Sequence, residues 1–105
     1  MSVQSTFETI QNRINSDERD QLLAVGSVFQ FHFTGDEAGD WYIDLKNGSA
    51  SQGTASDADC TVTMDGGDFV DLYNGDEQGM TLFMSGRLQL DGDMGVAMKL
   101  MEIMG

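Results

Sequence analysis

Few side chains in this sequence could carry catalysis. The chain has one cysteine, Cys60, and one histidine, His32. His32 alternates with phenylalanines along an apolar–polar segment, so its side chain is predicted to face solvent, while Cys60 alternates inward as a buried thiol. A buried thiol is more often a packing residue than a nucleophile, and no serine lies in a nucleophile elbow. We therefore expect no catalytic residue and no enzyme activity.

Metal and cofactor motifs are also missing from the sequence. Asp57 and Asp59 have the spacing of the first ligands of a calcium loop, but the sixth position holds Val62 where that loop needs glycine. No zinc spacing and no glycine-rich phosphate loop is present. We therefore expect neither a metal site nor a cofactor.

The methionines are the most informative residues. Seven of the eight lie beyond residue 63, and five fall within the last 22 residues. A methionine side chain is unbranched and polarizable, so it fills irregular or changing volumes well. Two interpretations stay open: these residues fill gaps in a core, or they line a pocket for flexible apolar molecules.

Charge excludes several classes of partner. The formal net charge is −13, with 18 acidic residues against five basic ones. Such a field repels phosphate backbones, so we expect no nucleic acid partner. It also disfavours lasting attachment to anionic lipid surfaces, and we expect at most transient membrane contact. General solubility or a saline habitat would each explain the acidity.

Length and the termini indicate the setting. A chain of 105 residues forms one domain, here 1–105. No apolar run approaches the roughly 18 residues of a membrane span, no signal peptide is visible, and a lone cysteine suits a reducing compartment. We expect a cytoplasmic protein.

Apolar periodicity predicts ten elements. Helices are expected at 3–14, 17–25, 65–73, 78–84 and 93–104, and strands at 28–34, 41–46, 49–54, 60–64 and 87–91. This order predicts an α+β domain: a five-stranded mixed, mostly antiparallel sheet with helices on one face. The connection between the last two strands is expected to be a crossover that places the fifth strand parallel to its spatial neighbour, next to the first strand.

The last helix is too apolar for an ordinary surface helix. One of its stripes holds Met94, Ala97, Met98 and Met101, and a second holds Val96, Leu100 and Ile103. A surface helix carries a single apolar face. This helix could be clamped in the core, dock on a partner subunit, or cover a cavity with apolar contents.

Five segments in order along the chain resemble the sterol carrier protein type 2 (SCP-2, non-specific lipid-transfer) domain family. They are residues 28–31, 41–49, 68–72, 83–88 and 92–100. The resemblance implies helices that cover one face of a five-stranded sheet and enclose an apolar tunnel. It also implies a ligand that is a fatty acid, fatty acyl-CoA, sterol or phospholipid.

The sequence departs from that family in three respects. It ends in residues 102–105 without a Ser/Ala-Lys-Leu type address, so peroxisomal import is not expected. It has Met101 where many relatives carry glutamine, and it is acidic where familiar relatives are basic.

Binding and transfer of lipids inside the cell is therefore the predicted function. Burial of an acyl chain of about 14 methylenes offers on the order of 11 kcal/mol before ordering costs, and micromolar affinity needs about 8 kcal/mol. The predicted lining consists of Phe31, Phe33, Val62, Met64, Phe69, Leu72, Phe83, Met84, Met94, Met98 and Met101. We expect a monomer. The alternative is a non-catalytic interaction module of the same fold whose apolar last helix forms a homodimer.

Overall fold

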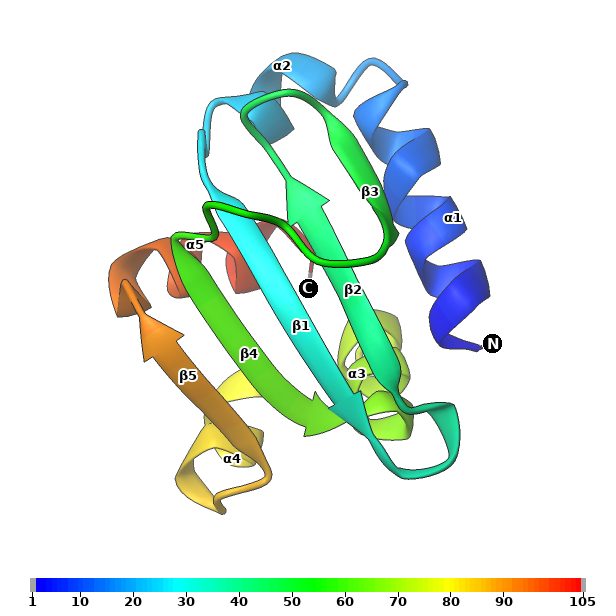
Figure 1. Ribbon diagram of the computed structural model, residues 1–105, viewed down its shortest axis with the longest axis vertical. Coiled ribbons are helices and arrows are strands. Elements are labelled where there is room, and N and C mark those ends of the chain that lie inside the picture. Colours follow the sequence, from blue (N-terminus) through cyan, green and yellow to red (C-terminus); the bar gives the residue numbers. More distant parts are fainter. Residues whose placement is uncertain (1, 105) are drawn as a thin grey trace.

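A five-stranded mixed sheet forms one layer of the computed structural model, which describes residues 2–104 and the side chains of residues 2–100. The strand order is β3-β2-β1-β4-β5 (Figure 1). The strands are β1 (Val28–Thr34), β2 (Gly39–Asp44), β3 (Ser49–Gln52), β4 (Cys60–Asp65) and β5 (Leu88–Gly92). The α+β class predicted from the sequence is confirmed.

The helices follow the predicted positions closely. They are α1 (Val3–Ile14), α2 (Arg19–Leu23), α3 (Gly66–Asn74), α4 (Gly79–Met84) and α5 (Met94–Met104), with a short 3-10 turn η1 (Gly35–Glu37). Side chains fix their starts: the N–H groups of Gly67 and Asp68 donate to Asp65 Oδ1 at α3. At α5, the N–H of Gly95 donates to Asp93 Oδ1. Both aspartates are the caps expected from the sequence.

The place predicted for the fifth strand is wrong. β1 does pair in parallel, but its partner is β4, with Phe31 opposite Val62. β5 lies at the edge and pairs antiparallel with β4, with Met64 opposite Leu88. The reason is that α3 and α4 together return the chain to the end of β4 where it left, so no crossover occurs there.

The crossover occurs instead between β3 and β4. The loop at 53–59 passes over the face of the sheet that carries no helix and reaches the far side of β1 (Figure 1). Gln30 of β1 holds this loop: its Nε2 donates to the carbonyl of Gly53 at 3.1 Å, and its Oε1 accepts from the N–H of Ala55 at 2.7 Å. Gln30 is therefore buried although it lies on the face away from the helices.

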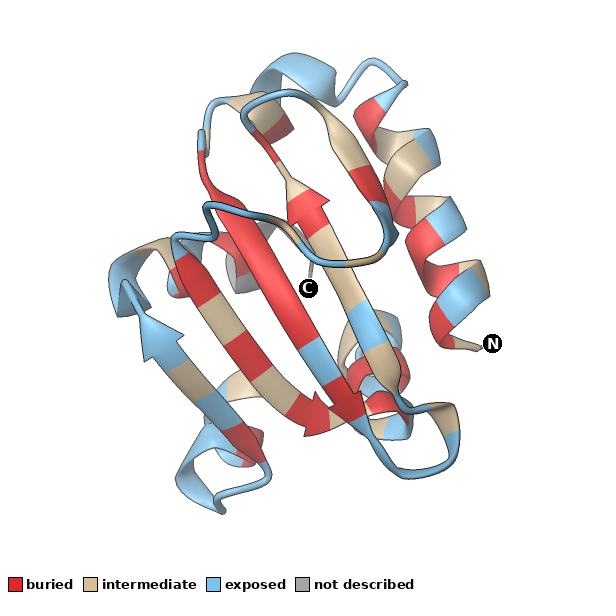
Figure 2. Ribbon diagram, viewed as in Figure 1, coloured by how far each residue is buried: buried red, intermediate tan, exposed pale blue. Residues whose placement is uncertain are grey.

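The core lies between the sheet and the helices. Phe7 of α1 contacts three other phenylalanine rings in this core. Its ring centroid lies 5.8 Å from that of Phe31, 6.0 Å from that of Phe33 and 5.5 Å from that of Phe69. Trp41 of β2 packs on the same ring at 4.7 Å. Buried residues run along β1 and alternate along β4, while α4 and β5 are mostly exposed (Figure 2).

Candidate functional site

A small apolar void lies beneath the last helix. Its volume is about 10 Å³, roughly the space for one water molecule. Leu100 of α5 closes it, and the remaining lining comes from α1, α2, β2 and the residue that follows β2: Ile10, Arg13, Ile14, Leu22, Ile43 and Leu45. Six aliphatic side chains and one cation thus meet where α5 rests on the domain.

Arg13 is the one charged group in this lining. Its Nε and Nη2 donate to Glu18 Oε2 at 3.0 and 2.8 Å, and its Nη1 donates to the hydroxyl of Tyr73 at 3.3 Å. Burial lowers the pKa of Arg13, but the hydrogen bonds to Tyr73 and Glu18 outweigh it and raise the pKa above its ordinary value. The guanidinium therefore stays charged and leaves the aliphatic part of its side chain against the void.

α5 attaches to the domain through few side chains. In the part of α5 whose side chains are described, Ala97 and Leu100 are buried and Val96 is partly buried against the core. Met94 and Met98 are each 47% exposed. The inward face of the helix thus cuts across the two predicted stripes, because Ala97 of the first stripe and Leu100 of the second are buried while Met94 and Met98 of the first stripe face outward.

The predicted lining residues fall into three groups. Buried on the helix side of the sheet, or on α3 against it, are Phe31, Phe33, Val62, Met64 and Phe69. Leu72 is partly buried. Exposed on α4 and α5 are Phe83, Met84, Met94 and Met98. The side chain of Met101 lies outside the described residues.

Sequence reasoning missed the residues that line the void. Ile10, Ile14, Ile43 and Leu45 all have an inward position in the apolar periodicity, but nothing in that pattern separates a fully packed residue from one beside a gap. Leu100 was assigned to a stripe of the last helix without a role. The missing information was that Leu100 of this helix lines the same void as residues of α1 and β2.

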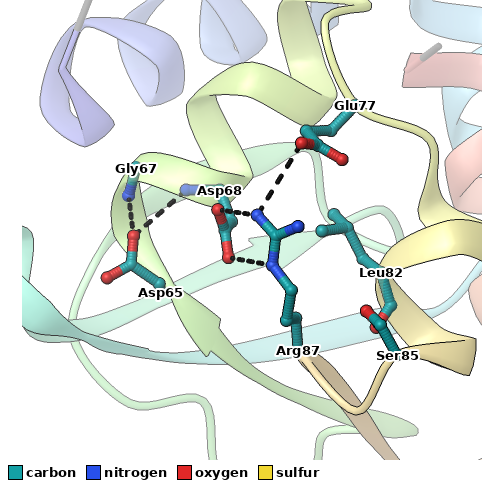
Figure 3. A network of polar contacts seen from close by, with 7 residues as sticks. All are labelled: Asp65, Gly67, Asp68, Glu77, Leu82, Ser85 and Arg87. Carbon is teal, nitrogen blue, oxygen red and sulfur yellow. Dashed lines mark hydrogen bonds and ion pairs between the residues drawn. The ribbon is translucent and has the colours of Figure 1, made fainter.

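A second polar cluster ties α3 to the start of β5 (Figure 3). Arg87 Nη2 lies 2.7 Å from Asp68 Oδ1 and 3.7 Å from Glu77 Oε1. The hydrogen bond to Asp68 and the charge of that carboxylate raise the pKa of Arg87. This cluster fixes the two ends of the segment that contains α4, because Glu77 precedes that helix and Arg87 follows it.

The two residues considered for catalysis lie in unlike surroundings. His32 Nδ1 is 2.6 Å from Asp40 Oδ1 on an exposed part of the sheet. Cys60 is 1% exposed, and burial, together with the charges of Asp93 and Asp91, raises the pKa of its thiol. Cys60 is therefore protonated at neutral pH and is a poor nucleophile.

The described residues contain neither a metal-binding cluster nor a helix that could span a membrane. No group of three or more histidine, cysteine, aspartate or glutamate side chains among them could hold a metal ion. None of the described helices has the length and apolar character to cross a bilayer.

Comparison with known proteins gives a consistent family match. The model of the SCP-2 sterol transfer family matches residues 7–105. The chain is 37% identical to hydroxysteroid dehydrogenase-like protein 2 of Xenopus tropicalis over 98% of this chain and 25% of the relative. It is 34% identical to sterol carrier protein 2 of Gallus gallus over 92% of this chain and 19% of the relative. The chain thus spans about a quarter or less of these relatives.

Solved structures agree with the sequence relatives. The crystal structure of sterol carrier protein 2 like 2 from Aedes aegypti matches with a TM-score of 0.80 and 27% identity, over 98% of this chain and 96% of that one. The solution structure of the palmitated form of the same protein matches with a TM-score of 0.78 and 28% identity, over 99% and 95%.

Proposed function

The chain belongs to the SCP-2 sterol transfer family, and from this premise we propose that it binds lipids and transfers them inside the cell without catalysing a reaction on them. The ligand is a fatty acid, fatty acyl-CoA, sterol or phospholipid. Its apolar part lies between the sheet and the helices. The palmitated relative supports an acyl chain as ligand.

The attachment of α5 is the observation that carries this proposal. The helix covers an apolar void, and the pair Ala97 and Leu100 provides its buried contact among the described side chains. A void of about 10 Å³ holds no acyl chain, so in this proposal α5 moves outward to admit one. Burial of roughly 0.8 kcal/mol per methylene would stabilise the opened form.

The lining predicted from the sequence enters the proposal in two parts. The buried residues Phe31, Val62, Met64 and Phe69 would form the apolar wall on the sheet side, with Phe33 beside them. Leu72, Phe83, Met84, Met94, Met98 and Met101 belong to the helical side, where a movement of the helices would change their exposure. Methionine suits this role because its side chain adapts to guests of different shape.

Substitution of Leu100 tests this binding site. We expect Leu100→Gln to reduce the affinity for a fluorescent fatty acid about tenfold, since the bound acyl chain would lose an apolar contact worth roughly 1.5 kcal/mol and would face an amide that it cannot hydrogen-bond. Lys99→Gln is the control, because it changes an exposed neighbour on the same helix. Affinity is measured by titration, after circular dichroism has verified that both variants fold.

Native mass spectrometry of protein purified from cells tests the function itself. Bound lipid mass on a monomer supports a carrier. An empty dimer would contradict the proposal and would favour the interaction module that uses its last helix.

A further inference from the structure

Large apolar side chains are exposed on two helices at the β5 edge of the molecule. α4 precedes β5 and α5 follows it, and both lie beside this edge strand (Figure 1). Exposed fractions are 55% for Met80, 36% for Phe83, 79% for Met84 and 47% each for Met94 and Met98. We call these five residues the β5-edge patch. Exposed apolar side chains that gather along one edge mark an interaction site more often than single scattered ones do.

Most of the exposed apolar side chains of this patch belong to α4. Leu82 is fully buried and anchors the helix, while Met80, Phe83 and Met84 are exposed. A six-residue helix that leaves three of its four large apolar side chains exposed gains less from folding than a helix whose apolar residues all face the core. Its outward face would therefore gain from a partner that removes it from water.

The charge around α4 narrows the choice of partner. Residues 78–86 contain no acidic or basic side chain, in a chain of net charge −13. The ionised groups at the two ends of this stretch are Glu77 and Arg87, which lie 3.7 Å apart, and Arg87 also pairs with Asp68 (Figure 3). The stretch thus presents an uncharged apolar surface, and the guanidinium of Arg87 offsets part of the negative charge at its ends.

Three occupants can be compared on these charges. A second copy of the chain would add its own net charge of −13 to the complex, and an anionic bilayer would be repelled in the same way. A zwitterionic bilayer has no net charge, and its interfacial region accepts methionine and phenylalanine side chains. We propose that the β5-edge patch docks this protein on zwitterionic phospholipid surfaces, an inference that rests on the proposed lipid-carrier function.

Vesicle flotation with phosphatidylcholine tests this docking. The wild-type chain is compared with the variant Met80→Glu, which changes a patch residue outside the proposed lining, and with the control Ser51→Glu, which adds the same charge at an exposed position of β3, the opposite edge. We expect the patch variant to lose vesicle binding about tenfold or more, because apolar burial is replaced by charge. The control variant should float as wild type does. Fatty acid affinity in solution is measured on all three proteins.

Each outcome decides one question. Loss of flotation with retained fatty acid binding supports docking through the patch. Equal flotation of both variants overturns the docking and leaves the carrier function standing. Flotation on phosphatidylglycerol but not on phosphatidylcholine also overturns the docking. A dimer that the wild type and the control variant form, but the patch variant does not, overturns it as well. Absence of fatty acid binding by the wild type removes the carrier function, and this inference with it.

Discussion

Gln30 shows how one buried amide can organise a sheet. Its side chain is 3% exposed and bonds the carbonyls of Trp41 and Gly53 and the N–H of Ala55. These partners belong to β2 and to the loop that crosses the sheet. Because a buried polar group without a partner costs more than a bond contributes, this amide and the loop hold each other in place.

Replacement of this amide should destabilise the whole domain. For Gln30→Ala we expect a loss of about 2 to 3 kcal/mol in the free energy of unfolding, since Ala55 N–H and two carbonyls lose their partner. Urea denaturation measures it. Gln52→Ala, which removes an exposed amide from β3, is the control. A difference under about 0.5 kcal/mol between the two variants would mean that the loop is held by other contacts.

The sequence gives no sign of this role. In the pattern of β1, Gln30 has the alternate position that usually faces solvent, and a chain segment 23 residues away covers it.

The residues of the candidate site were equally hard to place from the sequence. Phe31 and Met84 were both assigned to the lining because of their residue type, yet one is 3% exposed and the other 79%. The residue type indicates that a side chain prefers apolar surroundings, but the packing of the helices decides whether that side chain is buried.

At the scale of elements, the turn from β2 to β3 illustrates local control. Asp44 Oδ1 accepts from the N–H groups of Lys46 and Asn47, both at 2.9 Å, and Asp44 Oδ2 accepts from Asn47 Nδ2 at 3.0 Å. Burial raises the pKa of Asp44, but these bonds to Asn47 and Lys46 outweigh it and lower the pKa below its ordinary value. The ionised carboxylate therefore stabilises the hairpin.

The contribution of Asp44 should depend on pH. Its folded pKa lies below the unfolded value of about 3.9, so its stabilisation is complete above that value and is lost as pH falls through the folded pKa. We expect Asp44→Asn to lower the free energy of unfolding by less than about 1 kcal/mol at neutral pH. The difference from wild type should vanish in acid. Thermal scans across pH check this, with the exposed Asp57→Asn as control; a constant difference would contradict the assignment.

Element positions could be read from the sequence, but their neighbours could not. Periodicity located each strand to within about two residues at most ends, and the caps Asp65 and Asp93 are as predicted. The position of β5 was wrong because a connection of two helices can either cross the sheet or return to the same end. Only the packing of α3 and α4 decides between these routes.

Across the whole molecule, the repulsion that accompanies a net charge of −13 is expected to exceed the attraction within the few ion pairs. The pairs of Arg13, Lys46 and Arg87 with carboxylates all involve partly exposed side chains, and such pairs contribute little. Repulsion among the remaining acidic residues acts against the compact state.

Salt should therefore stabilise this protein. As NaCl rises from about 0.01 M to about 0.1 M, the screening length falls from about 30 Å to about 10 Å, and we expect Tm to rise by a few degrees. Differential scanning calorimetry measures this shift. Choline chloride at equal ionic strength should reproduce it if screening is the cause. A Tm that falls with salt would show that the ion pairs dominate.

The parallel contact between β1 and β4 has a consequence for how the chain reaches its folded form. These strands form the middle of the sheet, yet Val28 and Asp59 at their start are 31 residues apart along the chain. Closing a long loop costs entropy before any contact compensates it. The hairpin of β1 and β2 joins sequence neighbours and can form early. The central ladder of the sheet is therefore expected to be the late, rate-limiting step of refolding.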